Sequence, residues 1–170
     1  SLFNGDYSKR KLKKFLPYNS EVKIIKKVGK FGKFDNYWIK INDLKKINFK
    51  NKDIFKGIKF FKNTKYLWGG KSFKGIDCSA LVQIFLNYNN RYCPRDSKDQ
   101  EKYFKKRIKI KNIKKNDLIF WKGHVAVALS KNKLIHAYGP LKKVVVMDIK
   151  KTIKRIDKTA NLKITSIRRI

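Results

Sequence analysis

The chain is poor in the residues that build metal sites and disulfide frameworks. Its 170 residues include two cysteines, Cys78 and Cys93, and two histidines, His124 and His136. These four residues are too few, and too widely spaced, for a structural zinc site. We therefore expect no metal and no cofactor. A disulfide between the two cysteines stays an open alternative.

Long apolar runs are also missing. No segment approaches the ~18 consecutive apolar residues that a membrane-spanning helix needs, so no membrane span is expected. Hydrophobic residues nevertheless make up 42% of the chain and aromatic residues 14%. That supply is enough for a packed core, so the high charge does not imply disorder.

Acidic residues are scarce. Twelve of them face 45 lysines and arginines, which gives a net charge of +33. Such a balance is typical of nucleic-acid-binding proteins, but here lysine supplies 38 of the basic residues and is spread from end to end. We interpret the lysines as a bias toward AT-rich codons. We expect no specific nucleic-acid partner, only salt-dependent attraction to polyanions.

Residues 1–47 have the pattern of a small β module. Segment 21–28 is rich in β-branched residues, and segment 37–41 alternates between apolar and polar residues after a turn-forming pair. Two or three short strands here indicate a small barrel. The polar stretch 45–52 is predicted to be the linker to the next domain.

Residues 48–170 have the pattern of an α+β domain, with helices first and an antiparallel meander after them. Apolar spacing predicts helices at 53–62, 77–87 and 96–104. Alternation with a period of two predicts strands at 118–121, 124–129, 133–138, 143–148 and 163–169.

Cys78 directly follows Asp77, a good N-cap for the helix predicted at 77–87. The positive end of a helix dipole and its unpaired N–H groups favour a thiolate, which is the nucleophilic form of cysteine. The glycines that precede Cys78 would let the backbone pass close to a substrate. The alternative is that Cys78 is a small buried hydrophobic residue.

The two histidines fall on neighbouring predicted strands, which suggests a base and the group that orients it. A two-residue turn between the strands would place His136 on the opposite face from His124. A three-residue loop at 130–132 instead places His136 opposite Ala126, diagonal to His124 on one face. We predict the odd-length loop, with His124 as base and His136 as orienter.

Three segments of the chain have distinctive motifs, YLWGGKSFKGIDCSALVQ (66–83), NDLIFWKGHVAVAL (116–129) and KLIHAYG (133–139). In this order and spacing they resemble the NlpC/p60 family of cell-wall cysteine peptidases. The resemblance covers about 53–170 and departs from the family mainly at Ala80, where glycine is usual. It implies a papain-like α+β catalytic domain, with helices packed on an antiparallel sheet. It also implies that Cys78, His124 and His136 form the triad.

The segment CPRDSKDQ (93–100) is similar to one branch of that family, which hydrolyses the γ-D-glutamyl–diamino acid bond of peptides with a free N-terminal L-alanine. The resemblance implies a peptidoglycan-derived peptide as substrate, and a pocket in which Asp77 meets the substrate amine. The residues implied to line it are Tyr66, Asp77, Ser79, Asp96 and Ser97. The alternative is that both aspartates only cap helices.

In the same branch, SH3-like β-barrels precede the catalytic domain and close part of the cleft. Residues 1–47 resemble one such module through FDNYWIKINDL (34–44), in which Tyr37 is implied to reach the substrate amine. A monomer is expected. Recycling of wall fragments would place the enzyme in the cytoplasm, which we favour slightly over the periplasm or the cell exterior.

Two other functions remain open. The same triad on a papain-like scaffold serves amidases and acyltransferases that act on other substrates. A non-catalytic basic module that binds wall polymer or nucleic acid would need no reactive cysteine.

Overall fold

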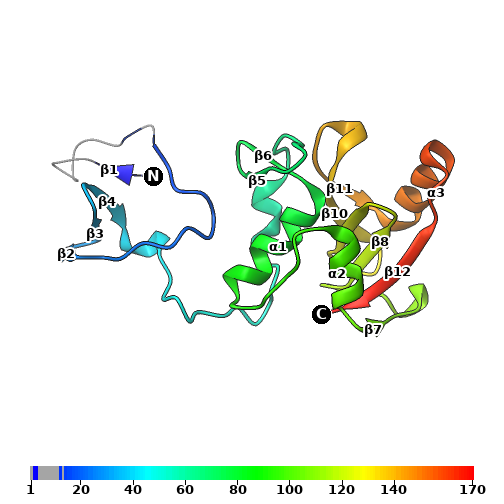
Figure 1. Ribbon diagram of the computed structural model, residues 1–170, viewed down its shortest axis with the longest axis horizontal. Coiled ribbons are helices and arrows are strands. Elements are labelled where there is room, and N and C mark those ends of the chain that lie inside the picture. Colours follow the sequence, from blue (N-terminus) through cyan, green and yellow to red (C-terminus); the bar gives the residue numbers. More distant parts are fainter. Residues whose placement is uncertain (1, 4–11, 13) are drawn as a thin grey trace. The chain divides into compact units, whose positions relative to one another are not determined.

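A computed structural model describes residues 2–3, 12 and 14–170. The chain divides into two compact units, the first ending at Phe49 and the second running from Lys50 to Ile170 (Figure 1). Residues 1, 4–11 and 13 of the predicted β module lie outside the described residues. Within the described part of the chain, no helix is long and apolar enough to cross a membrane.

The first unit contains one antiparallel sheet of four strands in the order β1-β4-β3-β2. The strands are β1 (Leu2–Phe3), β2 (Lys26–Val28), β3 (Phe31–Phe34) and β4 (Tyr37–Lys40), followed by a short 3-10 helix, η1 (Ile41–Asp43). Phe34 and Ile39 form its small core. The strand predicted at 21–28 is therefore too long, β3 was not predicted, and the sheet alone does not establish a barrel.

The second unit is an α+β domain built on a six-stranded antiparallel sheet, in the order β11-β10-β9-β8-β12-β7. Its strands are β7 (Lys106–Arg107), β8 (Leu118–Trp121), β9 (His124–Ala128), β10 (Lys133–Tyr138), β11 (Lys143–Asp148) and β12 (Ile164–Arg169). The helices are α1 (Cys78–Tyr88), α2 (Ser97–Tyr103) and α3 (Ile149–Ala160). A small hairpin, β5 (Lys71–Ser72) and β6 (Gly75–Ile76), and short 3-10 helices η2 (Ile58–Phe61), η3 (Ile110–Asn112) and η4 (Gly139–Leu141) complete it.

Both faces of the central sheet are covered. On one face, Ile119 and Leu134 pack with Ile149 and Ile156 of α3. On the other face α1 packs against β9 and β10. Strands buried on both faces read as continuous apolar runs rather than alternating ones, which is why β8 is buried at all four positions.

The helix predicted at 53–62 is wrong. Only the short 3-10 helix η2 forms there, after Gly57, whose φ of +85° is left-handed and ends any helix begun before it. As a result the predicted apolar face is split. Phe61 is 1% exposed and Phe60 is 82% exposed.

Helix α3 was missed, and with it the path of the last strand. Asp148 caps α3 by accepting a hydrogen bond from the N–H of Lys151 at 3.0 Å. Ile149, Ile153 and Ile156 form its apolar stripe among many lysines. The chain then returns along α3, so β12 pairs with β8 at the far side of the sheet and does not extend the meander beside β11.

Candidate active site

Cys78 is the first residue of α1, and Asp77 is its N-cap. One carboxylate oxygen of Asp77, Oδ1, accepts a hydrogen bond from the N–H of Ala80 at 2.8 Å. This confirms the cap predicted from the sequence, with the helix ending one residue later than expected. The thiol therefore lies at the end of α1 where backbone N–H groups have no partner within the helix.

The glycines before Cys78 serve the loop more than a substrate. A Cβ on Gly70 would lie 2.5 Å from the carbonyl oxygen of Gly75, so the β5–β6 hairpin closes only around glycine. Gly69 donates its N–H to the other carboxylate oxygen of Asp77, Oδ2, at 2.9 Å. The expectation that these glycines admit substrate fits Gly69, which lines a cavity, but not Gly70.

The Cys78 thiol is 7% exposed, and burial raises its pKa from 9.0 to about 11. The backbone N–H groups of Val125, Ser79 and Cys78 itself lower the pKa, but burial outweighs them. With this pKa the thiol is protonated at neutral pH, so the expectation of a standing thiolate is wrong. Cys78 and Cys93 are both free thiols, so they form no disulfide with each other. Burial raises the pKa of Cys93 to about 12.

The predicted histidine register is confirmed. Strands β9 and β10 pair Leu134 with Ala128, and the N–H of Leu129 donates to the carbonyl of Lys133 at 2.8 Å across a three-residue loop. The rings of His124 and His136 consequently meet on one face, with Nε2 of His124 2.8 Å from Nδ1 of His136.

Met147, which was not predicted to be a site residue, determines the tautomers of His124 and His136. His136 is 1% exposed, and its Nε2 lies 3.4 Å from the thioether sulfur of Met147. A thioether only accepts hydrogen bonds, so Nε2 of His136 carries the proton and Nδ1 accepts from Nε2 of His124. Nδ1 of His124 is then left unprotonated.

Burial also sets the charge of both imidazoles. It lowers the pKa of His124 from 6.5 to about 4. It lowers the pKa of His136 well below 6.5, with the neighbouring charge of His124 as a second cause. At neutral pH both rings are therefore uncharged, and each is a hydrogen-bond acceptor at one nitrogen.

A cavity of about 460 Å³ opens in front of Cys78. It brings together all five pocket residues predicted in this unit, namely Tyr66, Asp77, Ser79, Asp96 and Ser97. Burial raises the pKa of Tyr66, and the negative charges that Cys78 and Asp77 carry when deprotonated raise it further. Tyr37 belongs to the first unit, where its hydroxyl accepts a hydrogen bond from Nζ of Lys14 at 3.1 Å.

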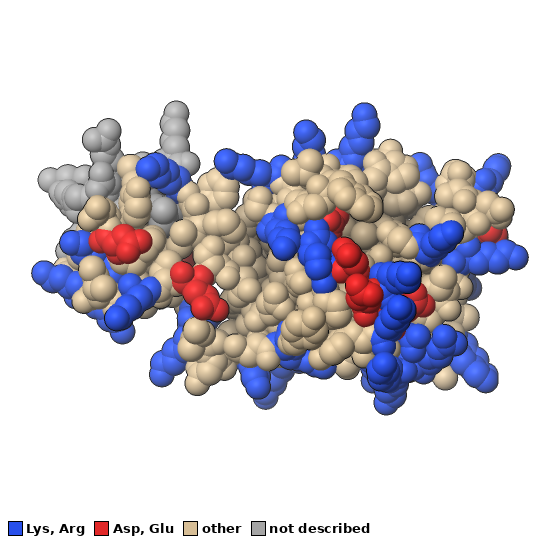
Figure 2. Space-filling view, viewed as in Figure 1, with Lys and Arg blue, Asp and Glu red and all other residues tan. Residues whose placement is uncertain are grey.

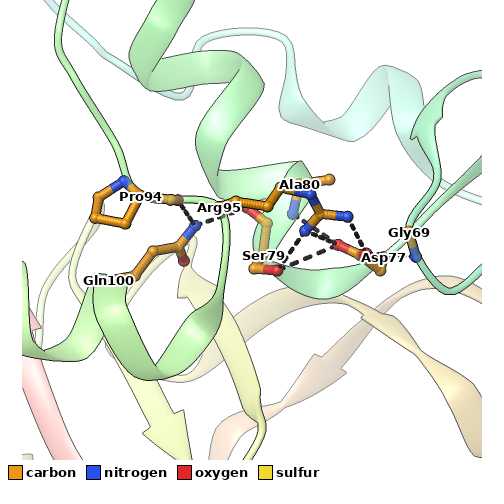
Figure 3. A network of polar contacts seen from close by, with 7 residues as sticks. All are labelled: Gly69, Asp77, Ser79, Ala80, Pro94, Arg95 and Gln100. Carbon is orange, nitrogen blue, oxygen red and sulfur yellow. Dashed lines mark hydrogen bonds and ion pairs between the residues drawn. The ribbon is translucent and has the colours of Figure 1, made fainter.

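Arg95, which was also missed, lines this cavity and forms the centre of a polar network (Figure 3). Arg95 donates to both carboxylate oxygens of Asp77 and, at 2.9 Å, to the hydroxyl of Ser79. The amide of Gln100 donates to the carbonyls of Ser79 and Pro94, each at 2.9 Å, and so ties α2 to α1.

The two aspartates of the cavity are not equivalent. Asp77 is 5% exposed and already accepts hydrogen bonds from Gly69, Ala80 and Arg95. Asp96 occupies the N-cap position of α2, but its side chain makes no capping hydrogen bond, and it is exposed to the cavity. The capping alternative thus holds for the side chain of Asp77 and not for that of Asp96.

Among the described residues, no three histidine, cysteine, aspartate or glutamate side chains come close enough to hold a metal ion. The chemistry that the side chains can supply is that of a thiol, a pair of hydrogen-bonded neutral imidazoles, and a pocket with one arginine, one lysine and one accessible carboxylate.

The α+β fold, with a thiol at the start of a helix and a hydrogen-bonded histidine pair on the sheet, is consistent with a cysteine peptidase. Residues 63–160 match the model of the NlpC/P60 family, and the chain belongs to that family.

Two curated relatives are dipeptidyl peptidases. One is dipeptidyl-peptidase 6 of Lysinibacillus sphaericus, 42% identical over 44% of this chain and 27% of the relative. The other is γ-D-glutamyl-L-lysine dipeptidyl-peptidase of Bacillus subtilis, 32% identical over 59% of this chain and 36% of the relative. The chain thus spans about a third of the length of these relatives.

A solved structure of an NlpC/P60 family protein from Bacillus cereus has the same fold. It superposes with a TM-score of 0.74 at 21% identity, over 91% of this chain and 55% of that one.

Proposed function

We propose that the chain is a cysteine peptidase that hydrolyses the γ-D-glutamyl–diamino acid bond of peptidoglycan-derived peptides. One observation carries the proposal. Cys78 is the first residue of α1, and α1 packs against β9, whose first residue, His124, is hydrogen-bonded to His136. The names of the two dipeptidyl-peptidase relatives support the choice of bond.

The proposed reaction begins from a neutral pair. The unprotonated Nδ1 of His124 takes the thiol proton as the Cys78 sulfur attacks the γ-carbonyl carbon of D-glutamate. The developing oxyanion lies near the N-terminus of α1, where the backbone N–H of Cys78 stabilises it. His124 then protonates the leaving amine, and water hydrolyses the resulting thioester.

His136 and Met147 act through His124 in this account. His136 donates a hydrogen bond from Nε2 to the Met147 sulfur, so toward His124 it can only accept a hydrogen bond, at Nδ1. This arrangement holds the His124 ring and keeps its other nitrogen free for the thiol proton.

Among the charged groups that line the cavity, substrate recognition is proposed to divide between Arg95 and Asp96. The Arg95 side chain, 27% exposed, would bind the α-carboxylate of D-glutamate. Asp96 is the carboxylate free to meet the N-terminal amine, while Asp77 holds Arg95 in place. Tyr66, Ser79 and Ser97 would supply the remaining hydrogen bonds.

The chain is proposed to act as a monomer, and its first unit is proposed to be an SH3-like module. The four-stranded antiparallel sheet of the first unit, and the place of this unit before the catalytic domain in the sequence, support the SH3-like assignment. Lysine and arginine side chains are dispersed over the face seen in Figure 2 rather than gathered in one patch. That dispersal favours a compositional origin of the charge over a nucleic-acid site.

The test uses L-Ala-γ-D-Glu-meso-diaminopimelate and detection of released L-Ala-D-Glu by mass spectrometry. Cys78→Ala is expected to abolish release but keep substrate binding. Cys93→Ala, at a buried thiol outside the cavity, is the matched control and is expected to retain activity. Undiminished release by Cys78→Ala would refute the proposal.

A further inference from the structure

A second cavity of about 460 Å³ adjoins the one in front of Cys78. Tyr66 and Gly123 line both cavities, but His124 lines only the second. The second cavity extends from His124 to helix α3, whose residues Arg155 and Ile156 form part of its wall.

The position of His124 indicates what this cavity holds. In the proposed reaction, His124 must return its proton to the nitrogen that leaves with the diamino acid. That nitrogen, and the group attached to it, must therefore lie against His124. Because the acyl half of the substrate occupies the cavity with Arg95 and Asp96, the second cavity is the space left for the leaving half.

The lining of the second cavity has a definite chemical character. Apolar surfaces come from Tyr138, Pro140, Ile156 and Leu162, and suit the methylene chain of a diamino acid. The charged groups are Lys122 and Arg155, both exposed. Among the residues that the structure describes, no aspartate or glutamate lines this cavity.

We infer that this cavity is the leaving-group subsite, and that it selects a diamino acid with a side-chain carboxylate, such as meso-diaminopimelate, over lysine. The inference rests on the proposed function. Two cations and no anion attract the terminal carboxylate of diaminopimelate and repel the bare ε-ammonium of lysine.

The experiment compares kcat/KM for L-Ala-γ-D-Glu-meso-diaminopimelate with kcat/KM for L-Ala-γ-D-Glu-L-lysine. For the unmodified chain we expect a preference of about tenfold for diaminopimelate, the size typical of a few partly solvated charge contacts. Arg155→Glu and, separately, Lys122→Glu are expected to reduce this ratio at least several-fold, toward one or below.

Lys154→Glu is the matched control. It changes the net charge by the same amount on the same exposed helix but does not line the cavity, so the ratio should stay unchanged. Unfolding curves of the three variants verify that they fold, and the two cavity variants test the inference independently.

The outcomes separate this inference from the function on which it rests. Cleavage of neither peptide by the unmodified chain overturns both. Cleavage of both peptides with equal efficiency, or a preference that Arg155→Glu and Lys122→Glu leave intact, overturns only the subsite. A ratio that falls equally in Lys154→Glu points to overall charge and also overturns it.

Discussion

The charge of His124 can be tested through stability, with a perturbation that removes only that ring. Its pKa is 6.5 in an exposed chain and about 4 in the fold, because burial disfavours the imidazolium. Below pH 6.5 the unfolded chain binds a proton that the folded chain refuses until about pH 4. The associated stability is therefore full above pH 6.5 and is lost as the pH falls toward 4.

The size of this effect follows from the same two values. At about 1.4 kcal/mol per pH unit, the window from 6.5 to about 4 corresponds to between about 3 and 4 kcal/mol. Because one edge of the ring is exposed to solvent, we take roughly 2–3 kcal/mol as the expected effect. His124→Gln has no such group. We therefore expect its stability relative to the unmodified chain to improve by that amount as the pH is lowered.

The assay is urea unfolding of both proteins at pH values from about 7.5 to about 4, followed by tryptophan fluorescence. The carboxylates titrate in both proteins and cancel in the difference, which therefore reports His124 together with its coupling to His136. A difference that does not change with pH would refute the reasoning. A difference that moves the other way would show that His124 is an imidazolium paired with a thiolate in the folded protein.

Three further predictions concern the contacts around the site. Met147→Leu removes the hydrogen-bond acceptor for His136 and should lower kcat about fivefold at constant KM, since one hydrogen bond is worth ~1 kcal/mol. Met147→Gln, which again offers an acceptor, should restore kcat. An unchanged imidazole ¹⁵N spectrum in the leucine variant would contradict the tautomer assigned to His136. Gly70→Ala should destabilise the fold by about 1–3 kcal/mol in thermal unfolding, because its Cβ would lie 2.5 Å from a carbonyl oxygen. Gly139→Ala is the control, and it should leave the stability nearly unchanged because the atoms nearest to its Cβ would lie 3.7 Å away. Gln100→Leu leaves two backbone carbonyls without their donor and should reduce the free energy of unfolding by roughly 2 kcal/mol in urea; a loss below a few tenths would show that these bonds are replaced by water.

Local chemistry made part of the site predictable. Asp77 followed by Cys78 specifies an N-cap and the first residue of a helix without any tertiary information. The histidine register depends only on loop length and the two-residue period of strands, and 130–132 has the odd length that brings the rings together. These features are determined by neighbours in the sequence.

Part of what escaped prediction depends on distant contacts. Helix α3 does not, because its N-cap Asp148 and its isoleucines at helical spacing are local signals that were missed. Met147 and Arg95 acquire their roles only from partners on other elements, His136 and Asp77. The pKa of Cys78 is set by burial in the folded domain, which outweighs the local helix terminus that the sequence reveals.

The central claim is that the Cys78 sulfur becomes covalently acylated during turnover. The most direct measurement is mass spectrometry of the protein after acid quenching in the presence of L-Ala-γ-D-Glu-meso-diaminopimelate. Trypsin cleavage at Arg91 separates the two cysteines into different peptides. We predict an L-Ala-γ-D-Glu adduct on the peptide that contains Cys78 and none on the peptide that contains Cys93. Turnover without any adduct, continuing undiminished in Cys78→Ala, would contradict the account.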